Sequence, residues 1–162
     1  MNRHERAVTN ERLYCCRLQL DWYAQQLNSG LLAPRILEIA CGEGLKSQLM
    51  TAYHSYLVEL CATYNWPVTS FNTAVDLKEA TVSCAELSEL LVLEREDSWL
   101  SRLLDESCSV IISDTSLPAS GGDIQLFQAS SQQSLLSIEE LQSCYLSLKK
   151  LIDKHRSHSE EW

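Results

Sequence analysis

The sequence predicts an all-α protein, a four- to five-helix bundle with one long central helix. Three observations support this prediction. Glycine (5) and proline (3) are scarce among the 162 residues, so few positions interrupt a helix. Valine, isoleucine and threonine are sparse beside leucine, which disfavours a strand-rich fold. Apolar residues recur every three or four positions in several long segments, which is the spacing of one helix face.

The length suits one domain. A chain of 162 residues can bury roughly 70% of its unfolded surface around a single core. We therefore expect one helical domain over residues 1–162. A flexible loop is expected near 113–135, where Ser, Pro, Gly and Gln accumulate. The tail from Ser157 to Trp162 is expected to fray.

The first helix is expected over residues 5–29. Apolar side chains step along it by three and four positions, and further apolar residues widen that face. Gly30 follows, and glycine at this place is typical of a left-handed helix end. The expected buried face consists of Leu13, Cys16, Leu20, Tyr23 and Leu27, widened by Tyr14, Leu18 and Trp22.

The central helix is expected over residues 34–65. Pro34 suits the first helical position, where its missing N–H costs nothing. Pro67 pushes the preceding residue out of the helical region and so ends the helix. Between them the periodicity is regular, and the apolar positions are Leu45, Leu49, Ala52, Tyr53, Tyr56, Leu57, Leu60 and Tyr64.

Residues 36–44, ILEIACGEG, permit a second interpretation. They resemble motif I of class I S-adenosylmethionine-dependent methyltransferases, in which a buried strand runs into a glycine turn beside the cofactor. That fold needs about six more strands alternating with helices, and the rest of the chain offers at most two weak candidates. Helical glycines cost only about 1 kcal/mol each. We favour a helix and leave open whether 36–44 forms a separate turn before it.

Shorter helices are expected after the central one. Residues 68–79 are expected to be a connection, and a third helix is expected at about 80–95. Asp97 or Ser98 can cap a fourth helix. The last helix should open at Ser137, because Glu140 completes a capping box three residues later. Its buried face is expected to be Leu141, Cys144, Tyr145, Leu148, Leu151 and Ile152.

Four short motifs occur in order along most of the chain: TNERLY (9–14), VELCATYNWP (58–67), SWLSRLL (98–104) and LSIEELQS (136–143). With these motifs the chain resembles a family of small uncharacterised bacterial proteins, a domain of unknown function that is all-helical. The resemblance implies a helical architecture. It implies no activity, cofactor or catalytic residue. The CGEG segment at 41–44 departs from the helix-forming residues expected there.

Charge and cysteine usage limit the choice of partners. The formal net charge of −9 repels phosphate backbones and anionic lipids, so we expect neither a nucleic-acid nor a membrane partner. The seven cysteines include no Cys-x-x-Cys pair, which favours reduced thiols and a cytoplasmic location. A local cluster of cations is interpreted as complementing a helix dipole: Lys149, Lys150, Lys154, His155 and Arg156.

No motif predicts chemistry. We expect no catalytic residue, no cofactor and no metal site. A tentative polar and aromatic spot inside the bundle is expected from five residues, because buried tyrosine hydroxyls need partners: Tyr14, Arg17, Tyr53, Tyr56 and Glu59.

The leading functional hypothesis is a non-enzymatic helical domain that acts through a protein partner or by forming a homo-oligomer. Scarce motifs, acidity and abundant amphipathic surface motivate it. The alternative is a bundle with an internal pocket for a small apolar or nucleotide-like ligand. A third, weaker hypothesis is the methyltransferase.

Overall fold

Helices make up nearly all of the part of the chain that the computed structural model describes, which is residues 3–67, 71–80, 84–105 and 136–160. These residues contain no strand, so the predicted all-α class is confirmed. Six helices lie in them: α1 Arg3–Ser29, α2 Pro34–Tyr64, α3 Ala74–Ala80, α4 Ala85–Arg95, α5 Trp99–Leu104 and α6 Ile138–Glu160.

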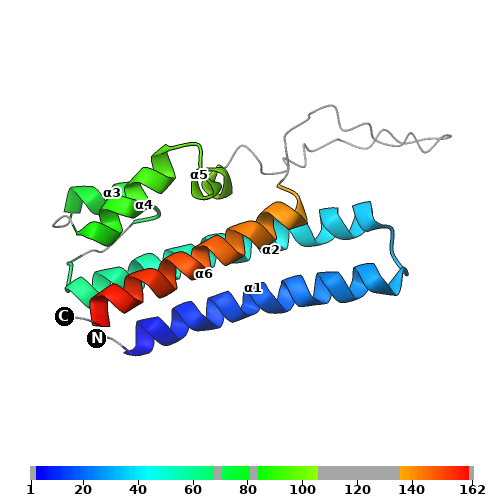
Figure 1. Cartoon of the computed structure of the whole chain (residues 1–162), viewed down its shortest axis with the longest axis horizontal. Helices are drawn as coiled ribbons and strands as arrows, with labels where there is room; N and C mark the ends of the chain where they lie inside the picture. The colour runs from blue at the N-terminus through cyan, green and yellow to red at the C-terminus, as the bar shows by residue number, and fades with distance from the viewer. Residues whose placement is uncertain (1–2, 68–70, 81–83, 106–135, 161–162) are drawn as a thin grey trace, which may run out of the picture.

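Helices α1 and α2 form a long antiparallel hairpin, and α6 lies along it (Figure 1). Helix α2 packs against both α1 and α6, so it is central, as predicted. The short helices α3, α4 and α5 lie on the side of α6 away from α1 (Figure 1). The sequence predicted four or five helices because the seven-residue α3 was expected to be a connection.

Local signals set the ends of the hairpin helices. Gly30 follows α1 with φ 66°, the left-handed conformation that glycine adopts at no steric cost. Pro34 is the first residue of α2. Asn65 ends α2 in the left-handed region with φ 53°, and the Trp66 N–H donates to Cys61 O at 2.9 Å. Pro67 follows, so the predicted end of the central helix is confirmed.

The glycine segment 41–44 lies inside α2. The helix runs without interruption from Pro34 to Tyr64, which answers the question about a separate turn. Neither Gly42 nor Gly44 has a positive φ, and a Cβ on either would meet no atom closer than 4.0 Å. A methyltransferase needs a strand and a glycine turn here, so that interpretation of residues 36–44 is wrong.

The region after α2 differs from the prediction. Residues 74–80 form α3, where a connection was expected. Thr73 and Asp76 explain this: Thr73 Oγ1 accepts from the Asp76 N–H at 3.4 Å, and Asp76 Oδ2 accepts from the Thr73 N–H at 3.0 Å. This reciprocal pair starts a helix. The third predicted helix begins later than expected, at Ala85, after Cys84.

The remaining caps agree with the sequence. Ser98 forms a capping box with Ser101 at the start of α5. Ser137 and Glu140 form the predicted box before α6, with bonds of 2.8 and 3.2 Å. Helix α6 then continues to Glu160, into the segment expected to fray. The loop predicted near 113–135 and residues 161–162 lie outside the described residues.

The hydrophobic core lies between α2, α6 and the inner faces of α1, α4 and α5. Leu49, Ala52, Leu57, Leu90 and Leu148 are all 0% exposed within it. None of the described helices is long and apolar enough to cross a membrane.

The predicted burial of one part of α1 is wrong. Tyr14, Leu18 and Trp22 were expected to widen the buried side, yet they are 58%, 48% and 49% exposed. At about 100° per residue they point away from Leu13 and Cys16, which pack into the core. Among the described helices, α2 and α6 make the main contacts with α1, and two neighbours cannot cover so wide an apolar face.

Candidate functional site

Polar side chains gather inside the bundle at one end, where α1 begins and α2 and α6 end (Figure 1). We call this the closed end. Glu59 of α2 and Arg156 of α6 are buried there, 6% and 9% exposed. Arg156 Nε and Nη2 donate to the two oxygens of Glu59, both at 2.8 Å. Nη1 donates to Asn10 Oδ1 of α1 at 2.8 Å. This bidentate ion pair joins three helices.

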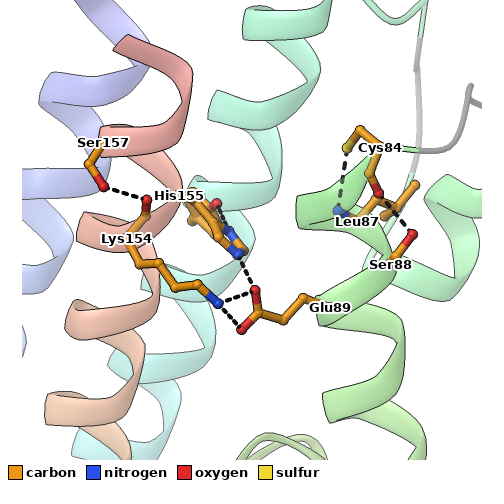
Figure 2. A network of polar contacts seen from close by, with 8 residues as sticks. Cys84, Leu87, Ser88, Glu89, Lys154, His155 and Ser157 are labelled. Atoms are coloured by element: carbon orange, nitrogen blue, oxygen red, sulfur yellow. Dashed lines mark hydrogen bonds and ion pairs between the residues drawn. The ribbon is translucent and has the colours of Figure 1, made fainter. Parts of the chain in front are cut away.

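A second polar chain joins α2, α6 and α4. His155, 3% exposed, contacts Tyr56 OH through Nδ1 and Glu89 Oε2 through Nε2 at 3.0 Å. Because a carboxylate can only accept, Nε2 carries a proton, and in a neutral ring Nδ1 then accepts from the Tyr56 hydroxyl. Lys154 Nζ donates to both Glu89 oxygens at 2.8 Å. Figure 2 shows Glu89 reaching from α4 to Lys154 and His155 on α6.

These contacts shift the ionisation of their members. The hydrogen bond from Lys154, supported by His155, holds the pKa of Glu89 below its ordinary value, although partial burial opposes this. Burial, together with the negative charge of Glu59, raises the pKa of the Tyr56 hydroxyl. Tyr56 therefore stays protonated, and its hydroxyl can donate to His155 Nδ1 when the ring is neutral.

Tyr53 forms a third connection, from α2 to α4 and α3. Its hydroxyl donates to Glu94 Oε1 at 2.6 Å. The same carboxylate accepts hydrogen bonds from the backbone N–H groups of Ala74 at 2.8 Å and of Val75 at 3.1 Å. Glu94 thus satisfies the first N–H groups of α3. Burial, together with the charge of Glu94, raises the pKa of Tyr53.

A small cavity lies among these groups, with a volume of about 20 Å³. That is room for about one water molecule. Burial tends to raise the pKa of Glu86, which lines the cavity, yet hydrogen bonds from its own N–H, Tyr64 and Cys84 lower it overall. Its lining is Tyr56, Glu59, Leu60, Thr63, Tyr64, Glu86, His155 and Arg156. This arrangement cross-links helices around a space for about one water molecule.

A larger hollow is an open groove of about 480 Å³ beside α3, α4 and α5. Glu94 and Arg102 on its walls already have partners, since Glu94 holds α3 and Arg102 lies 3.6 Å from Glu140. Its lining is Thr73, Val75, Glu94, Asp97, Ser101, Arg102, Leu104 and Asp105. In the described ranges, no three His, Cys, Asp or Glu residues are grouped so that they could hold a metal ion.

The structure separates the five residues of the predicted interior spot. Tyr53, Tyr56 and Glu59 are buried, at 1%, 1% and 6% exposure, and each has a polar partner. Tyr14 is 58% exposed, and the Arg17 side chain is 66% exposed and paired with Asp21. The interior placement of Tyr14 and Arg17 is therefore wrong, because both lie on the outer side of α1.

The sequence reasoning missed the partners of the buried three. His155 and Arg156 were interpreted as complementing a helix dipole, whereas they form the centre of the closed end. A signal existed: both follow Leu151 and Ile152 by four positions, so they continue the apolar face of α6. Glu59 likewise sits at a buried position of α2. A carboxylate on one inward face and an arginine on another indicate a buried ion pair.

The opposite end of the α1–α2 hairpin has a different surface. We call residues 24–40 the hairpin end. It extends beyond α6, with only α1 and α2 side by side (Figure 1). Large apolar side chains are exposed there, at 82% for Leu31, 47% for Leu32, 60% for Ile36 and 58% for Ile39. Next to it on α1 lies the row of Tyr14, Leu18 and Trp22, which we call the α1 stripe.

Fold and site together define an all-helical bundle held by buried polar cross-links at one end. A family model matches residues 1–162, and the chain belongs to this family, the family of unknown function DUF6586. The resemblance inferred from the four sequence motifs is thereby confirmed, while the bacterial origin stays a prediction. No curated protein and no solved structure matches the chain.

Proposed function

We propose that this protein is a non-enzymatic helical module that acts by binding a protein chain through the α1–α2 hairpin. One observation carries the proposal: exposed large apolar side chains concentrate on the α1 stripe and the hairpin end. Contiguous exposed apolar surface typically marks a protein-interaction site. The aromatic residues Tyr14 and Trp22 are of the types enriched where proteins bind one another.

The closed end supports this assignment by contrast. Its charged groups are paired with one another, as with Glu59 and Arg156 or Glu89 and Lys154. A catalytic group needs access to a substrate, whereas these groups surround a cavity for about one water. The alternative function is binding of a small apolar or nucleotide-like ligand inside the bundle. Such a ligand would have to fit into this cavity.

We further propose a cytoplasmic location. Cys16 and Cys144 are buried, and the described cysteines are free thiols. Burial raises the pKa of Cys16 to about 12, so this thiol stays protonated and resists oxidation. Such thiols act as small apolar core residues in a reducing compartment.

Site-specific photo-crosslinking in the producing cells tests the interaction. A photoreactive residue replaces Leu18 on the stripe, and the matched control carries it at Lys150, an exposed position on α6. We expect a protein adduct from position 18 that disappears when Trp22→Glu is added, and no such adduct from position 150. Circular dichroism and melting must show that all three variants fold alike.

The opposite result would overturn the proposal. Equal adducts from positions 18 and 150, or an adduct at 18 that survives Trp22→Glu, would mean that the stripe is not a specific binding surface. If position 18 gives no adduct at the natural expression level, the α1 stripe does not bind a protein in the cell and the proposal is wrong.

A further inference from the structure

We infer that the partner of the α1 stripe is a second copy of this chain, bound antiparallel along α1 about a two-fold axis near Leu18. This inference rests on the proposed function and names its partner. The argument uses the position of α1, the spacing of the stripe, and the charges beside it.

Helix α1 lies at the edge of the molecule, with α2 and α6 on one side (Figure 1). The stripe steps by four from Tyr14 to Leu18 and Trp22, so it forms one continuous ridge. At about 100° per residue, Leu18 lies close to diametrically opposite the buried Leu13 and Cys16. The outer side of α1 is therefore a helix face that a second helix can pack against without moving the bundle.

The stripe suits an antiparallel pairing of two identical helices. In an interface with two-fold symmetry the same patch occurs on both copies. With the axis near Leu18, the two Leu18 side chains meet at the centre. Tyr14 then packs against the partner's Trp22, and Trp22 against the partner's Tyr14. Each end of the ridge thus carries one aromatic pair, and such pairs stabilise an interface beyond the area that they bury.

The charges beside the stripe fit the same axis. Arg17 and Asp21 lie together on one flank, with side chains 66% and 58% exposed. Their mean position is residue 19, one residue from the centre of the stripe. A two-fold axis between residues 18 and 19 places Arg17 within one residue of the partner's Asp21 and further from the partner's Arg17, while Tyr14 stays within one residue of the partner's Trp22. Within one copy the two side chains form an ion pair, with Arg17 Nε 3.7 Å from Asp21 Oδ2, and both are exposed enough to contact a partner as well.

Net charge also favours a second copy over a partner of another kind. The whole chain carries −9, so most surfaces of two copies repel each other. Helix α1 contains four arginines and three acidic residues, which gives it a net charge of +1. Two copies can therefore approach through α1. The neighbouring Arg17 and Asp21 suit a partner that presents one charge of each sign, as a second copy does.

The expected dimer is weak. Three apolar side chains and one charge pair per copy form a patch smaller than the roughly 1,200–2,000 Å² that stable complexes bury. We therefore expect the mass in solution to depend on concentration in the micromolar range or above. At low concentration the protein should have the mass of one chain, 18.4 kDa.

Analytical ultracentrifugation with charge-swapped variants tests this geometry. Arg17→Asp makes the flank wholly acidic, and Asp21→Arg makes it wholly basic. Each variant alone should bind itself at least tenfold more weakly than the wild type, because like charges then face each other. An equimolar mixture should associate again, because every acidic position then meets a basic one. Leu18→Glu should abolish association.

Matched controls carry the same charge changes elsewhere. Lys150→Asp and Glu96→Arg change exposed residues on α6 and after α4 and should associate as the wild type does. The recovery of the mixture is a second control, since misfolded variants would not regain binding. Thermal melting of each variant confirms that it folds.

Several results would overturn the inference. A wild-type mass of one chain at all concentrations up to the millimolar range would exclude self-association. Unchanged association of the single variants would place the interface elsewhere, and a mixture that stays dissociated would exclude the antiparallel arrangement. A monomeric wild type whose Leu18 adduct contains a different protein would refute the second copy and leave the proposed function standing. A monomer with no adduct would refute both.

Discussion

The closed end and the hairpin end of the molecule are built on the same two helices but differ in what surrounds them. At the closed end α6, α3 and α4 lie beside the hairpin (Figure 1). The buried Glu59–Arg156 ion pair joins α2 to α6, and the half-exposed Glu89–Lys154 pair joins α4 to α6. At the hairpin end α1 and α2 have only each other, and Leu31, Ile36 and Ile39 are exposed. Leu37 is buried there at 1% exposure, yet it lies outside the main hydrophobic core.

Buried polar residues at the closed end specify how the helices pack, whereas exposed apolar residues at the hairpin end offer a surface for binding. At the closed end the geometry depends on paired charges, because a buried carboxylate without a partner is costly. The pairing therefore specifies which helices lie together. At the hairpin end no third helix of the described residues covers the exposed apolar side chains (Figure 1). That surface is available for binding, and we expect it to contribute little to the stability of the bundle.

The largest expected effect is at the buried ion pair. Arg156→Met leaves the Glu59 carboxylate buried without its partner, and we expect unfolding free energy to fall by about 3–5 kcal/mol. Urea unfolding at neutral pH measures it. The double variant Glu59→Met with Arg156→Met should recover most of the loss, because no buried charge remains. Equal stability of single and double variants would show that the pair is not what holds this end.

Leu57 and Leu37 are both fully buried, at 0% and 1% exposure, so substituting each with alanine compares the main core with the hairpin end. Leu57→Ala removes a side chain from the main core, and we expect a loss near the top of the range of about 2–5 kcal/mol for such changes. Leu37→Ala should cost near the bottom of that range, because two helices can close around the space more easily. Urea unfolding gives both values, and hydrogen exchange should show faster opening of residues 34–44 in Leu37→Ala alone. A larger loss for Leu37 would contradict the comparison.

The smallest effect concerns the glycines of α2. Gly42→Ala and Gly44→Ala should each raise the unfolding free energy by about 0.5–1 kcal/mol, because alanine favours the helix and space is available at both positions. Gly30→Ala is the control: its φ of 66° strains an alanine, so it should cost about 1 kcal/mol. Melting curves distinguish these signs. Destabilisation by alanine at 42 or 44 would mean that this segment is not a regular helix.

The helix boundaries could be predicted from the sequence because their causes are local. Pro34 begins α2, Asn65 ends it, and Ser137 with Glu140 begins α6, in each case through contacts within five residues. The one missed helix, α3, has the same kind of signal in Thr73 and Asp76. It was overlooked because seven residues are too few to show a periodic pattern.

The candidate site was predicted only in part. Tyr53 and Tyr56 could be placed inside because they lie on the apolar repeat of α2. Glu59 was placed there only as a partner for buried tyrosine hydroxyls. Their partners could not be assigned, since Glu59 and Arg156 are 97 positions apart in the chain. Periodicity shows that a face is apolar, and it carries no information about which helix covers that face or how far the cover extends.

The sequence by itself therefore determined the helical class, the long α2 and most helix ends, all through interactions between residues a few positions apart. Tertiary structure decided the rest. It buried Glu59 against Arg156 because α6 returns beside α2, and it left Tyr14, Leu18 and Trp22 exposed because no described helix covers the outer side of α1. Burial depends on the position of a distant segment, and that position is fixed only when the whole chain packs.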